Sequence, residues 1–425
     1  MIDPNRRHPG GLIDASQRTN AGLVLHLTSL RDASGNPDMT RCEDAAPVAT
    51  YLSGGRVLLG VADGLGGYVQ GFDRLTGGRI ASDLAMTIVL DYFKHLGPGL
   101  HPDPELLTNR IYKSLRHLQE TRMQASQVRG SLGRHRLATT LAVVVVDSRA
   151  VPETSTIQGY WIGDSRIYVF DQAGLHQLSR DDNLSGADAF DSLFEAAPMF
   201  QFLAATMERE WRMHWLGRTL EMPAVVFACT DGCFSEFPSP WAFEALLQNA
   251  LERANSWEDW ITQVRALLEP ALADDASLAA MPINLWSFEE FKQLRSGSET
   301  VLARCLATTQ ESSDKAREIW LSLYKPMYES APGVEICADG AMLNATHPAR
   351  PQALGSDQPP SSPPKVLSKS VSRRCLKCCC EPLALIRRAV GPENLKPWLI
   401  GFLCGLSSGA ILMAWLEYFW EGLNS

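Results

Sequence analysis

Acidic residues recur in this sequence at the ends of apolar runs, and their types and spacing are suited to binding a metal ion. Three places share this pattern, namely Asp63-Gly64, Asp164-Ser165 and Asp231-Gly232. Two further acidic pairs are Glu43-Asp44 and Asp274-Asp275. A carboxylate at the end of a buried strand is held rigidly yet faces a cleft, and a following glycine lets a ligand approach the backbone. Carboxylates that converge in one cleft take up protons or bind hard cations. Carboxylate and carbonyl ligands favour Mg²⁺ or Mn²⁺ over Zn²⁺.

Each of these pairs also has a simpler interpretation. Asp-Gly is a common hairpin turn, and a single such pair is more often a turn than a ligand. The periodicity of the sequence does not show that the five acidic sites meet in space. A metal centre therefore requires strands whose ends come together.

Short apolar runs supply the strands that such a centre needs. Runs rich in Val and bounded by Gly or Asp predict buried strands at Val57–Ala62, Leu141–Val146, Ile157–Ile162, Ile167–Phe170 and Ala224–Cys229. Apolar residues at four-residue spacing predict helices over Arg79–His95 and Glu105–Met123, and Trp241–Ala271 is also predicted to be helical. A strand, two long helices and then several strands indicate an α+β fold, with helices packed on largely antiparallel sheets.

The composition sets the broad class of the protein. Hydrophobic residues make up 45% of the 425 residues and charged residues 20%, which excludes a wholly disordered or fibrous chain. The formal net charge of -9 argues against a basic nucleic-acid-binding surface, so no nucleic-acid partner is expected. Ten cysteines do not form a disulfide scaffold, and the N-terminus lacks an apolar signal segment. We therefore expect most of the chain to lie in a reducing cytoplasm.

Changes in composition along the chain predict its division into segments. The expected order is a flexible lead-in (1–20), the main domain (21–286), a polar helical extension (287–330), a Pro/Ser-rich linker (331–371), a basic Cys-rich juxtamembrane segment (372–396) and a transmembrane helix (397–418).

Residues Trp398–Leu416 contain no charge and predict a single membrane-spanning helix. As a helix they extend over roughly 28 Å, close to the thickness of a hydrocarbon core. Positive residues precede this segment, at Arg373, Arg374, Lys377, Arg387, Arg388 and Lys396, whereas only Glu417 and Glu421 follow it. This asymmetry predicts that the main domain lies on the cytoplasmic face.

Two features near the predicted membrane segment allow more than one interpretation. Gly401, Gly405 and Gly409 form a small-residue stripe that favours a helix–helix partner, with plain lipid exposure as the alternative. The crowded cysteines Cys375, Cys378, Cys379 and Cys380 are interpreted as exposed reduced thiols. S-palmitoylation or a zinc site are the alternatives for these cysteines.

Five motifs in one order connect the acidic pairs to a known family. They are GVADGLGG at Gly60–Gly67 (followed by Gly78, Ala81 and Ser82), ATTL before GDSRIY at Gly163–Tyr168, LSRDD at Leu178–Asp182, FACTDGCF at Phe227–Phe234, and DDASLAA at Asp274–Ala280. Together they resemble the metal-dependent protein phosphatases, the type 2C serine/threonine phosphatases. The resemblance implies a sandwich of two antiparallel β-sheets flanked by helix pairs. It also implies hydrolysis of phosphoserine and phosphothreonine by a water that bridges two Mg²⁺ or Mn²⁺ ions.

The resemblance also assigns ligands, residue by residue. Asp63 should bridge both ions, Gly64 should offer its carbonyl to the second, and Asp44 with Glu43 should complete that second site. Asp231 and Asp274 should ligate the first ion. Asp164, with Asp231, matches residues that hold a third, weaker ion in many members. Catalysis is thus expected to act through Asp63 and Asp231, by way of the metals and water.

The sequence departs from the family pattern near Asp44. Members usually carry a phosphate-gripping Arg five residues before that aspartate, where this chain has Met39. Arg41 is our candidate for the phosphate-binding role, and Arg31 is a second nearby arginine. The family's variable segment corresponds to Leu184–Met222, which is rich in Phe, Met and Trp. We interpret it as a packed subdomain, with an apolar surface that selects protein substrates as the alternative.

These observations lead to one leading functional hypothesis and two alternatives. The leading hypothesis is a Mg²⁺- or Mn²⁺-dependent protein serine/threonine phosphatase, anchored to the cytoplasmic face of a membrane by one C-terminal helix. The first alternative is a pseudophosphatase that binds phosphoproteins without turnover, which the missing arginine and the unusual variable segment motivate. The second alternative is a phosphohydrolase for small phosphoesters.

Overall fold

The computed structural model describes most of the chain up to residue 335. The described residues are 21–65, 75–97, 100, 102–122, 137–151, 154–183, 186–194, 198–206, 211–285, 287–296, 299–308, 313–329 and 334–335. The predicted lead-in, the juxtamembrane segment with Cys375–Cys380, and the membrane segment with Gly401, Gly405 and Gly409 lie outside them. Among the described residues, no helix is both long and apolar enough to cross a membrane.

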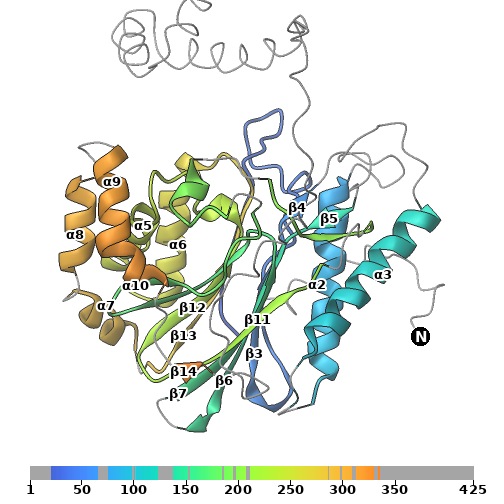
Figure 1. Ribbon diagram of the computed structural model, residues 1–425, viewed down its shortest axis with the longest axis horizontal. Coiled ribbons are helices and arrows are strands. Elements are labelled where there is room, and N and C mark those ends of the chain that lie inside the picture. Colours follow the sequence, from blue (N-terminus) through green and yellow to red (C-terminus); the bar gives the residue numbers. More distant parts are fainter. Residues whose placement is uncertain are drawn as a thin grey trace, which may run out of the picture. The chain divides into compact units, whose positions relative to one another are not determined.

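Two antiparallel sheets form the centre of the fold (Figure 1). One has six strands in the order β14 (Val334–Glu335), β11 (His214–Leu220), β7 (Thr154–Ile162), β6 (Leu141–Val151), β3 (Val57–Val61) and β2 (Val48–Tyr51). The other has five, in the order β1 (Leu23–Leu27), β13 (Ala276–Ile283), β12 (Ala224–Cys229), β8 (Arg166–Asp171) and β9 (Leu175–Gln177). A smaller three-stranded sheet joins β10 (Leu203–Ala204), β5 (Ala138–Thr139) and β4 (Gly64–Leu65).

The Val-rich runs are apolar throughout because both faces of their strands are buried. In β6, Val144 and Val146 lie in the layer between the two large sheets, while Val143 and Val145 face the helices outside. In β12, Val226 faces the inter-sheet layer and Phe227 faces the opposite helices. Successive side chains of a strand point to opposite faces, so a strand covered on both sides shows no polar alternation.

A helix pair covers each sheet, as the predicted α+β sandwich requires (Figure 1). The helices α2 (Gly77–His95) and α3 (Pro104–Arg122) pack on the six-stranded sheet, and α5 (Pro240–Arg253) and α6 (Trp257–Leu268) pack on the five-stranded sheet. Short 3-10 turns are η1 (Ser53–Gly55), η2 (Asp191–Leu193), η3 (Asp231–Cys233) and η4 (Glu269–Ala271).

The prediction that Trp241–Ala271 is helical is confirmed, with one interruption between Arg253 and Trp257, where α5 ends and α6 begins. The Ser256 side chain accepts a hydrogen bond from the Asp259 amide at 3.1 Å and caps the start of α6. Such a cap satisfies an amide that has no partner inside the helix, so it favours a new helix at this point.

The polar extension after the main domain is helical, as predicted, and it contributes to the same core. It contains α7 (Phe288–Ser296), α8 (Glu299–Thr308), α9 (Ser313–Ile319), the π-helical turn η5 (Trp320–Tyr324) and α10 (Lys325–Glu329). Its Trp320, Tyr324 and Tyr328 are buried with the residues of α5 and β8. The Tyr328 and Tyr168 hydroxyls lie 2.9 Å apart, and the Met327 carbonyl lies 2.7 Å from His176 Nδ1.

Two stretches differ from the segments expected from composition. Val334–Glu335, at the start of the predicted linker, forms β14 and pairs with Arg218 and Thr219 at the edge of the six-stranded sheet. Within the predicted variable segment, His214–Leu220 is β11 and pairs along its whole length with β7. Residues 186–194 and 198–206 of that segment are named the flap.

Candidate metal centre

Aspartates from several strand ends influence one another electrostatically. Burial raises the pKa of Asp63 well above the ordinary aspartate range, and nearby negative charges add to this effect. In decreasing order, those charges belong to Asp44, Asp231, Asp164 and Asp274. Asp63 follows β3, Asp231 opens η3 after β12, and Asp164 lies in the turn between β7 and β8. The strand ends therefore bring together residues that are far apart in the sequence.

Two threonines fix the backbone at Asp63. The Asp63 carbonyl accepts hydrogen bonds from Thr139 Oγ1 at 2.6 Å and from the Thr140 amide at 2.8 Å. The Thr140 hydroxyl also lies 2.7 Å from Ser165 Oγ, which links this strand end to the Asp164 turn. These bonds fix the main chain from which the Asp63 carboxylate extends.

Asp44 is fully buried, and only one of its two oxygens is bonded. Its Oδ2 accepts a hydrogen bond from Thr230 Oγ1 at 2.9 Å, and Thr230 directly precedes Asp231. Its Oδ1 is buried and accepts no hydrogen bond within the described residues. Burial raises the pKa of Asp44 to about 8. A buried carboxylate oxygen without a partner is costly, and a cation ligand would satisfy it.

Glu43 is held through its main chain, which leaves its side chain available. The Glu43 amide donates to Asp275 Oδ2 at 2.6 Å, and its carbonyl accepts from Ser82 Oγ at 2.7 Å. Burial raises the pKa of the Glu43 carboxyl to about 7, although a hydrogen bond from Thr76 opposes this. Asp275 also accepts from the Ser29 amide at 3.3 Å, so it joins two loops of the centre.

Asp231 and Asp164 form a second coupled pair. Burial and then the neighbouring Asp164 raise the pKa of Asp231 to about 8. Burial and then Asp181 raise the pKa of Asp164 to about 6. Asp164 Oδ1 is buried without a hydrogen-bond partner in the described part of the chain. Asp274 is exposed at the edge of the centre, where it acts on Asp63 and Asp231 through its charge.

Close backbone approach explains the glycines in two of the acidic pairs. A Cβ at Gly64 would collide with the backbone of Glu43 and of Gly78. A Cβ at Gly232 would collide with the backbone of Asp275. The loops after β3 and β12 therefore come so close to their neighbours that only glycine fits.

A cavity of 530 Å³ opens beside these carboxylates. It is lined by Ser29, Leu30, Arg41, Glu43, Thr76, Ala273, Asp274 and Asp275. Arg41 is exposed in its wall, whereas Arg31 is paired with Glu269 at 3.5 Å. Cys42 is buried, with its sulfur 3.2 Å from His26 Nε2. Of the two candidate arginines, Arg41 is the one that lines the cavity with the acidic residues.

The donor set fits a hard divalent cation. Two buried carboxylate oxygens lack partners, the surrounding carboxyls retain protons because they are buried and repel one another, and all the donors are oxygen atoms. Within the described residues, no group of three or more His, Cys, Asp or Glu side chains forms a closed cluster ready to hold a metal ion. The fit therefore rests on the unpaired oxygens and the close glycine contacts.

Comparison with known families decides the identity of this domain. Residues 35–276 match the family described as protein phosphatase 2C. The chain belongs to the protein phosphatase 2C family. All the carboxylates described above lie within the residues matched in this phosphatase 2C domain, and α7–α10 follow them. The family resemblance of the sequence is thus confirmed.

Solved structures similar to this phosphatase 2C chain come from bacteria. The Mycobacterium tuberculosis serine/threonine phosphatase PstP/Ppp is 16% identical, with a TM-score of 0.43 over 61% of this chain and 96% of that one. The serine/threonine phosphatase Stp1 from Staphylococcus aureus is 17% identical, with a TM-score of 0.45 over 61% and 94%. A PstP catalytic domain, 17% identical with a TM-score of 0.42 over 61% and 97%, was solved in complex with two manganese ions. No curated protein matches the chain.

Several supporting residues of the phosphatase 2C site were not predicted. Asp275 belongs to a predicted acidic pair but not to the predicted ligands; it is buried, and its carboxylate accepts hydrogen bonds from the Glu43 and Ser29 amides. Thr230 and Thr140 hold Asp44 and Asp63 through hydroxyl groups that carry no distinctive pattern. A signal was present in the sequence, because both threonines lie next to a motif residue at a strand end.

Binding of a divalent ion to the phosphatase 2C site is expected to tighten as the pH rises from about 6 to 8. The metal-free folded protein holds protons on Glu43, Asp44 and Asp231, whose pKa values are about 7, about 8 and about 8. A cation must displace these protons, so the apparent affinity should rise about tenfold per pH unit for each proton released. Calorimetric titration with Mg²⁺ at pH 6, 7 and 8 measures this, and an affinity that does not change with pH would contradict it.

The same protonation predicts the pH dependence of the metal-free protein's stability. The folded state binds protons that the unfolded chain releases at its ordinary carboxyl pKa near 4. The free energy of unfolding should therefore decrease as the pH rises from about 4 to about 8. Urea denaturation in the presence of a chelator checks the sign, and saturating Mg²⁺ should reverse the loss at pH 8.

Proposed function

We propose that this protein hydrolyses phosphoserine and phosphothreonine on proteins in a reaction that depends on two Mg²⁺ or Mn²⁺ ions. The observation that carries the proposal is the convergence of buried Asp44 with Asp63 and Asp231, with an unpaired Asp44 oxygen among them. Membership of the phosphatase 2C family supports the same reaction class. Such a concentration of buried carboxyl groups costs stability unless it serves a ligand.

Each residue of the centre would have its own part in the reaction. Asp63, Gly64, Asp44 and Glu43 would hold one ion, Asp63, Asp231 and Asp274 would hold the other, and Asp164 with Asp231 would serve a weaker third. When bound, divalent ions in such a centre lower the pKa of a water molecule and neutralise charge on the phosphoryl group. Arg41 would grip the phosphate with its planar guanidinium. Its place in the cavity wall beside Glu43 and Asp274 supports this role.

We further propose that Trp398–Leu416 tethers the phosphatase to the cytoplasmic face of a membrane. The support is the uncharged sequence of this segment and the basic residues that precede it. Gly401, Gly405 and Gly409 would offer a close contact for a second helix. Fractionation of cells that express the full chain or a chain ending at residue 371 would test the tether, since only the full chain should sediment with membranes.

Phosphate release from a phosphothreonine peptide tests the catalytic proposal. The full chain should release phosphate in proportion to bound Mn²⁺, and Asp231→Asn should not. Asp259→Asn is the matched control, because Asp259 lies in the first turn of α6, where its carboxylate accepts hydrogen bonds from Asn255 and Gln263. No release at saturating Mn²⁺ from a folded protein that still binds the phosphopeptide would favour the pseudophosphatase. Turnover of p-nitrophenyl phosphate without peptide turnover would favour the small-ester phosphohydrolase.

A further inference from the structure

The flap is attached to the metal centre at both of its ends. At one end, the amide of Gly163 donates to Asp182 Oδ2 at 2.9 Å, and the Asp182 amide donates to the Gly163 carbonyl at 3.0 Å. Gly163 directly precedes Asp164, and the Phe200 amide in the flap donates to the Asp182 carbonyl at 2.9 Å. The flap is therefore hydrogen-bonded, through Asp182, to the turn that carries Asp164.

The other end of the flap joins the strand that begins at Gly64. Leu203 of β10 pairs with Thr139 of β5, and Thr139 pairs in turn with Gly64 of β4. Thr139 also donates to the Asp63 carbonyl at 2.6 Å. A displacement of β10 would therefore be transmitted through β5 to Gly64 and to the Asp63 carbonyl.

The middle of the flap is bound to the C-terminal extension through one carboxylate. Asp188 Oδ2 accepts hydrogen bonds from Trp320 Nε1 at 2.9 Å, Lys325 Nζ at 2.9 Å and Arg317 Nη1 at 3.1 Å. Its Oδ1 accepts from Arg317 Nη1 at 3.0 Å, and from the amides of Phe190 at 3.2 Å and Asp191 at 3.1 Å. The Asp188 side chain is 12% exposed. One side chain therefore accepts two amide hydrogen bonds at the start of η2 and bonds to three residues of the extension.

The charge on Asp188 is favoured strongly by these contacts. Burial opposes ionisation, but the hydrogen bonds from Trp320, Lys325 and Arg317 hold the pKa of Asp188 well below the ordinary range. Charge-assisted bonds to a partly buried carboxylate are stronger than exposed surface pairs. Phe190 adds apolar contact, because its ring stacks on Trp241 and Trp320 with centroids 5.6 Å and 5.9 Å apart.

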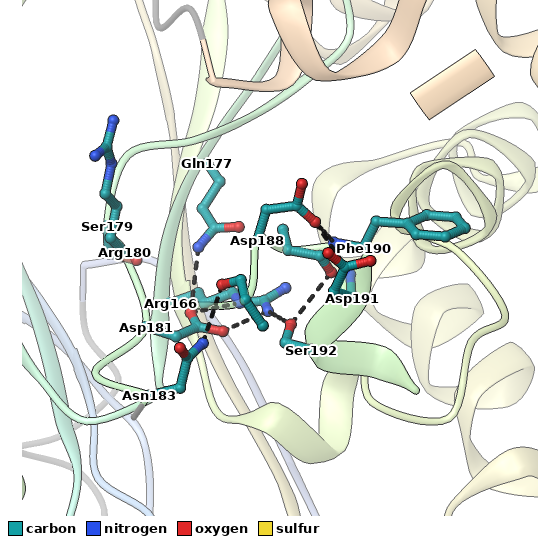
Figure 2. Close-up of polar contacts among 12 residues, drawn as sticks. Arg166, Gln177, Ser179, Arg180, Asp181, Asn183, Asp188, Phe190, Asp191 and Ser192 are labelled. Atoms are coloured by element: carbon teal, nitrogen blue, oxygen red, sulfur yellow. Dashed lines mark hydrogen bonds and ion pairs between the residues drawn. The ribbon is translucent and has the colours of Figure 1, made fainter. Parts of the chain in front are cut away.

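A second connection runs from the η2 turn back to the Asp164 loop (Figure 2). Arg166 Nη2 donates to Ser192 Oγ of η2 at 3.0 Å and to Asp181 Oδ2 at 2.6 Å, and Arg166 Nε donates to Asp181 Oδ1 at 2.9 Å. Asp181 is the largest charge acting on Asp164. The hydroxyl of Tyr168 accepts from Arg166 at 3.2 Å and lies 2.9 Å from the Tyr328 hydroxyl. The extension thus reaches the Asp164 turn by a continuous series of polar contacts.

We infer that Asp188 is a positioning residue through which the extension α8–α10 holds the flap in the place that protein substrates require. The inference rests on the proposed phosphatase function, and it adds a role for helices that follow the family match at Ala276. The flap borders the centre at Gly163 and at Thr139, so its position shapes the approach of a polypeptide. A small phosphoester reaches the metals without needing that surface.

Removing the partners of Asp188, rather than Asp188 itself, tests this inference. In the full chain, Arg317→Met and Lys325→Met together should lower kcat/KM for a phosphothreonine peptide by between about tenfold and 100-fold. The rate on p-nitrophenyl phosphate at saturating Mn²⁺ should change by less than about twofold, because the metal ligands are untouched. Lys325→Arg, which keeps the positive charge, should retain the peptide activity.

A second measurement keeps the inference testable if the protein shows no turnover. The Ala205 amide of the flap donates to the Leu137 carbonyl at 3.0 Å. Its rate of hydrogen exchange measures how often the flap separates from Leu137. The double variant should exchange this amide at least about tenfold faster than the unchanged chain. Glu329→Gln is the matched control, since it removes the i,i+4 partner of Lys325 at 3.6 Å but leaves Asp188 intact.

The possible results separate the inference from its alternatives. Faster exchange together with a selective loss of peptide turnover supports it. Faster exchange in a protein that is inactive on both substrates supports the hold of the extension on the flap through Asp188 and rejects the phosphatase function. Unchanged exchange, or equal losses on the peptide and the small ester, would overturn it.

Discussion

Asp63→Asn should reduce metal-dependent phosphate release by at least about 100-fold and leave the metal-free fold intact. Loss of a residue that merely orients a metal ligand already costs between about tenfold and 100-fold in activity or affinity, and Asp63 is proposed as a ligand of both ions. Its carboxylate lies among Asp44, Asp231 and Asp164, which repel it. An asparagine removes that repulsion, so the metal-free free energy of unfolding should stay equal or rise. Initial rates against Mn²⁺ concentration and a urea titration measure the two quantities.

The comparison with Asp259→Asn distinguishes this result from inactivation by misfolding, which any Asp-to-Asn replacement could cause. Asp259 accepts a main-chain amide hydrogen bond from Asn255 at the start of α6, and its carboxylate also accepts a hydrogen bond from Gln263 of the same helix. Its replacement should leave the rate within about twofold of the unchanged chain. An Asp63→Asn protein that retains full rate would remove Asp63 from the centre, and with it the assignment of Gly64.

Arg295→Ala should lower the free energy of unfolding by about 3–5 kcal/mol, because it leaves a buried carboxylate without its ion-pair partner. Arg295 on α7 is 2% exposed, and its guanidinium donates to Glu244 Oε1 at 3.0 Å, Gln248 Oε1 at 3.0 Å and the Asp171 carbonyl at 2.7 Å. It also lies 4.3 Å from the Phe170 ring centre. The side chain thus joins α7 to α5 and β8. Chemical denaturation followed by tryptophan fluorescence measures the loss.

An exposed ion pair elsewhere in the molecule supplies the control for that experiment. Arg116 and Glu120 on α3 lie 2.7 Å apart with both side chains more than half exposed, at 56% and 58%. Arg116→Ala should cost less than about 1 kcal/mol. If Arg295→Ala is equally mild, the extension is an appendage to the domain and not a part of its core.

The strands with the strongest apolar character were predictable. The neighbouring strands β1 and β13, on one side of the five-stranded sheet, were not. The predicted run Ala224–Cys229 matches β12 at both ends. In contrast, β13 begins with small residues directly after the acidic pair Asp274-Asp275, and β1 carries His26 among its leucines. Neither pattern is apolar enough to indicate a strand alone. Their pairing, Leu25 with Leu278, supplies the burial that each strand lacks in isolation.

The apolar side of the extension was hidden by its overall polarity. Trp320, Tyr324 and Tyr328 recur at four-residue spacing and are all buried, with exposed fractions of 0%, 0% and 1%. That spacing indicates one face of a helix, but aromatic residues with polar hydroxyls also suit a surface. Only the partner surface decides between the two, and it lies far away in the sequence, on β8 and α5.

The metal centre shows the same difference between local pattern and long-range contact. The acidic pairs predicted which residues would bind metal, and the family resemblance predicted that they converge. The supporting groups depend on contacts between distant segments, such as Asp275 with the Glu43 amide and Thr230 with Asp44. Such contacts leave no periodic trace in the sequence, because each is a single hydroxyl or carboxylate at one place.

The junction of the Ser29 amide with Asp275 has a consequence for how the protein is made. These two residues are 246 positions apart in the chain, and both flank the pairing of β1 with β13. At about 5–20 residues per second of synthesis, the N-terminal strand must wait on the order of 10–50 s on the ribosome for its partner. During that interval the apolar edge at Leu23–Leu27 has no neighbouring strand in its final sheet. Productive folding of the nascent chain therefore depends on keeping this short strand from pairing elsewhere until β13, the last strand of the five-stranded sheet, has been translated.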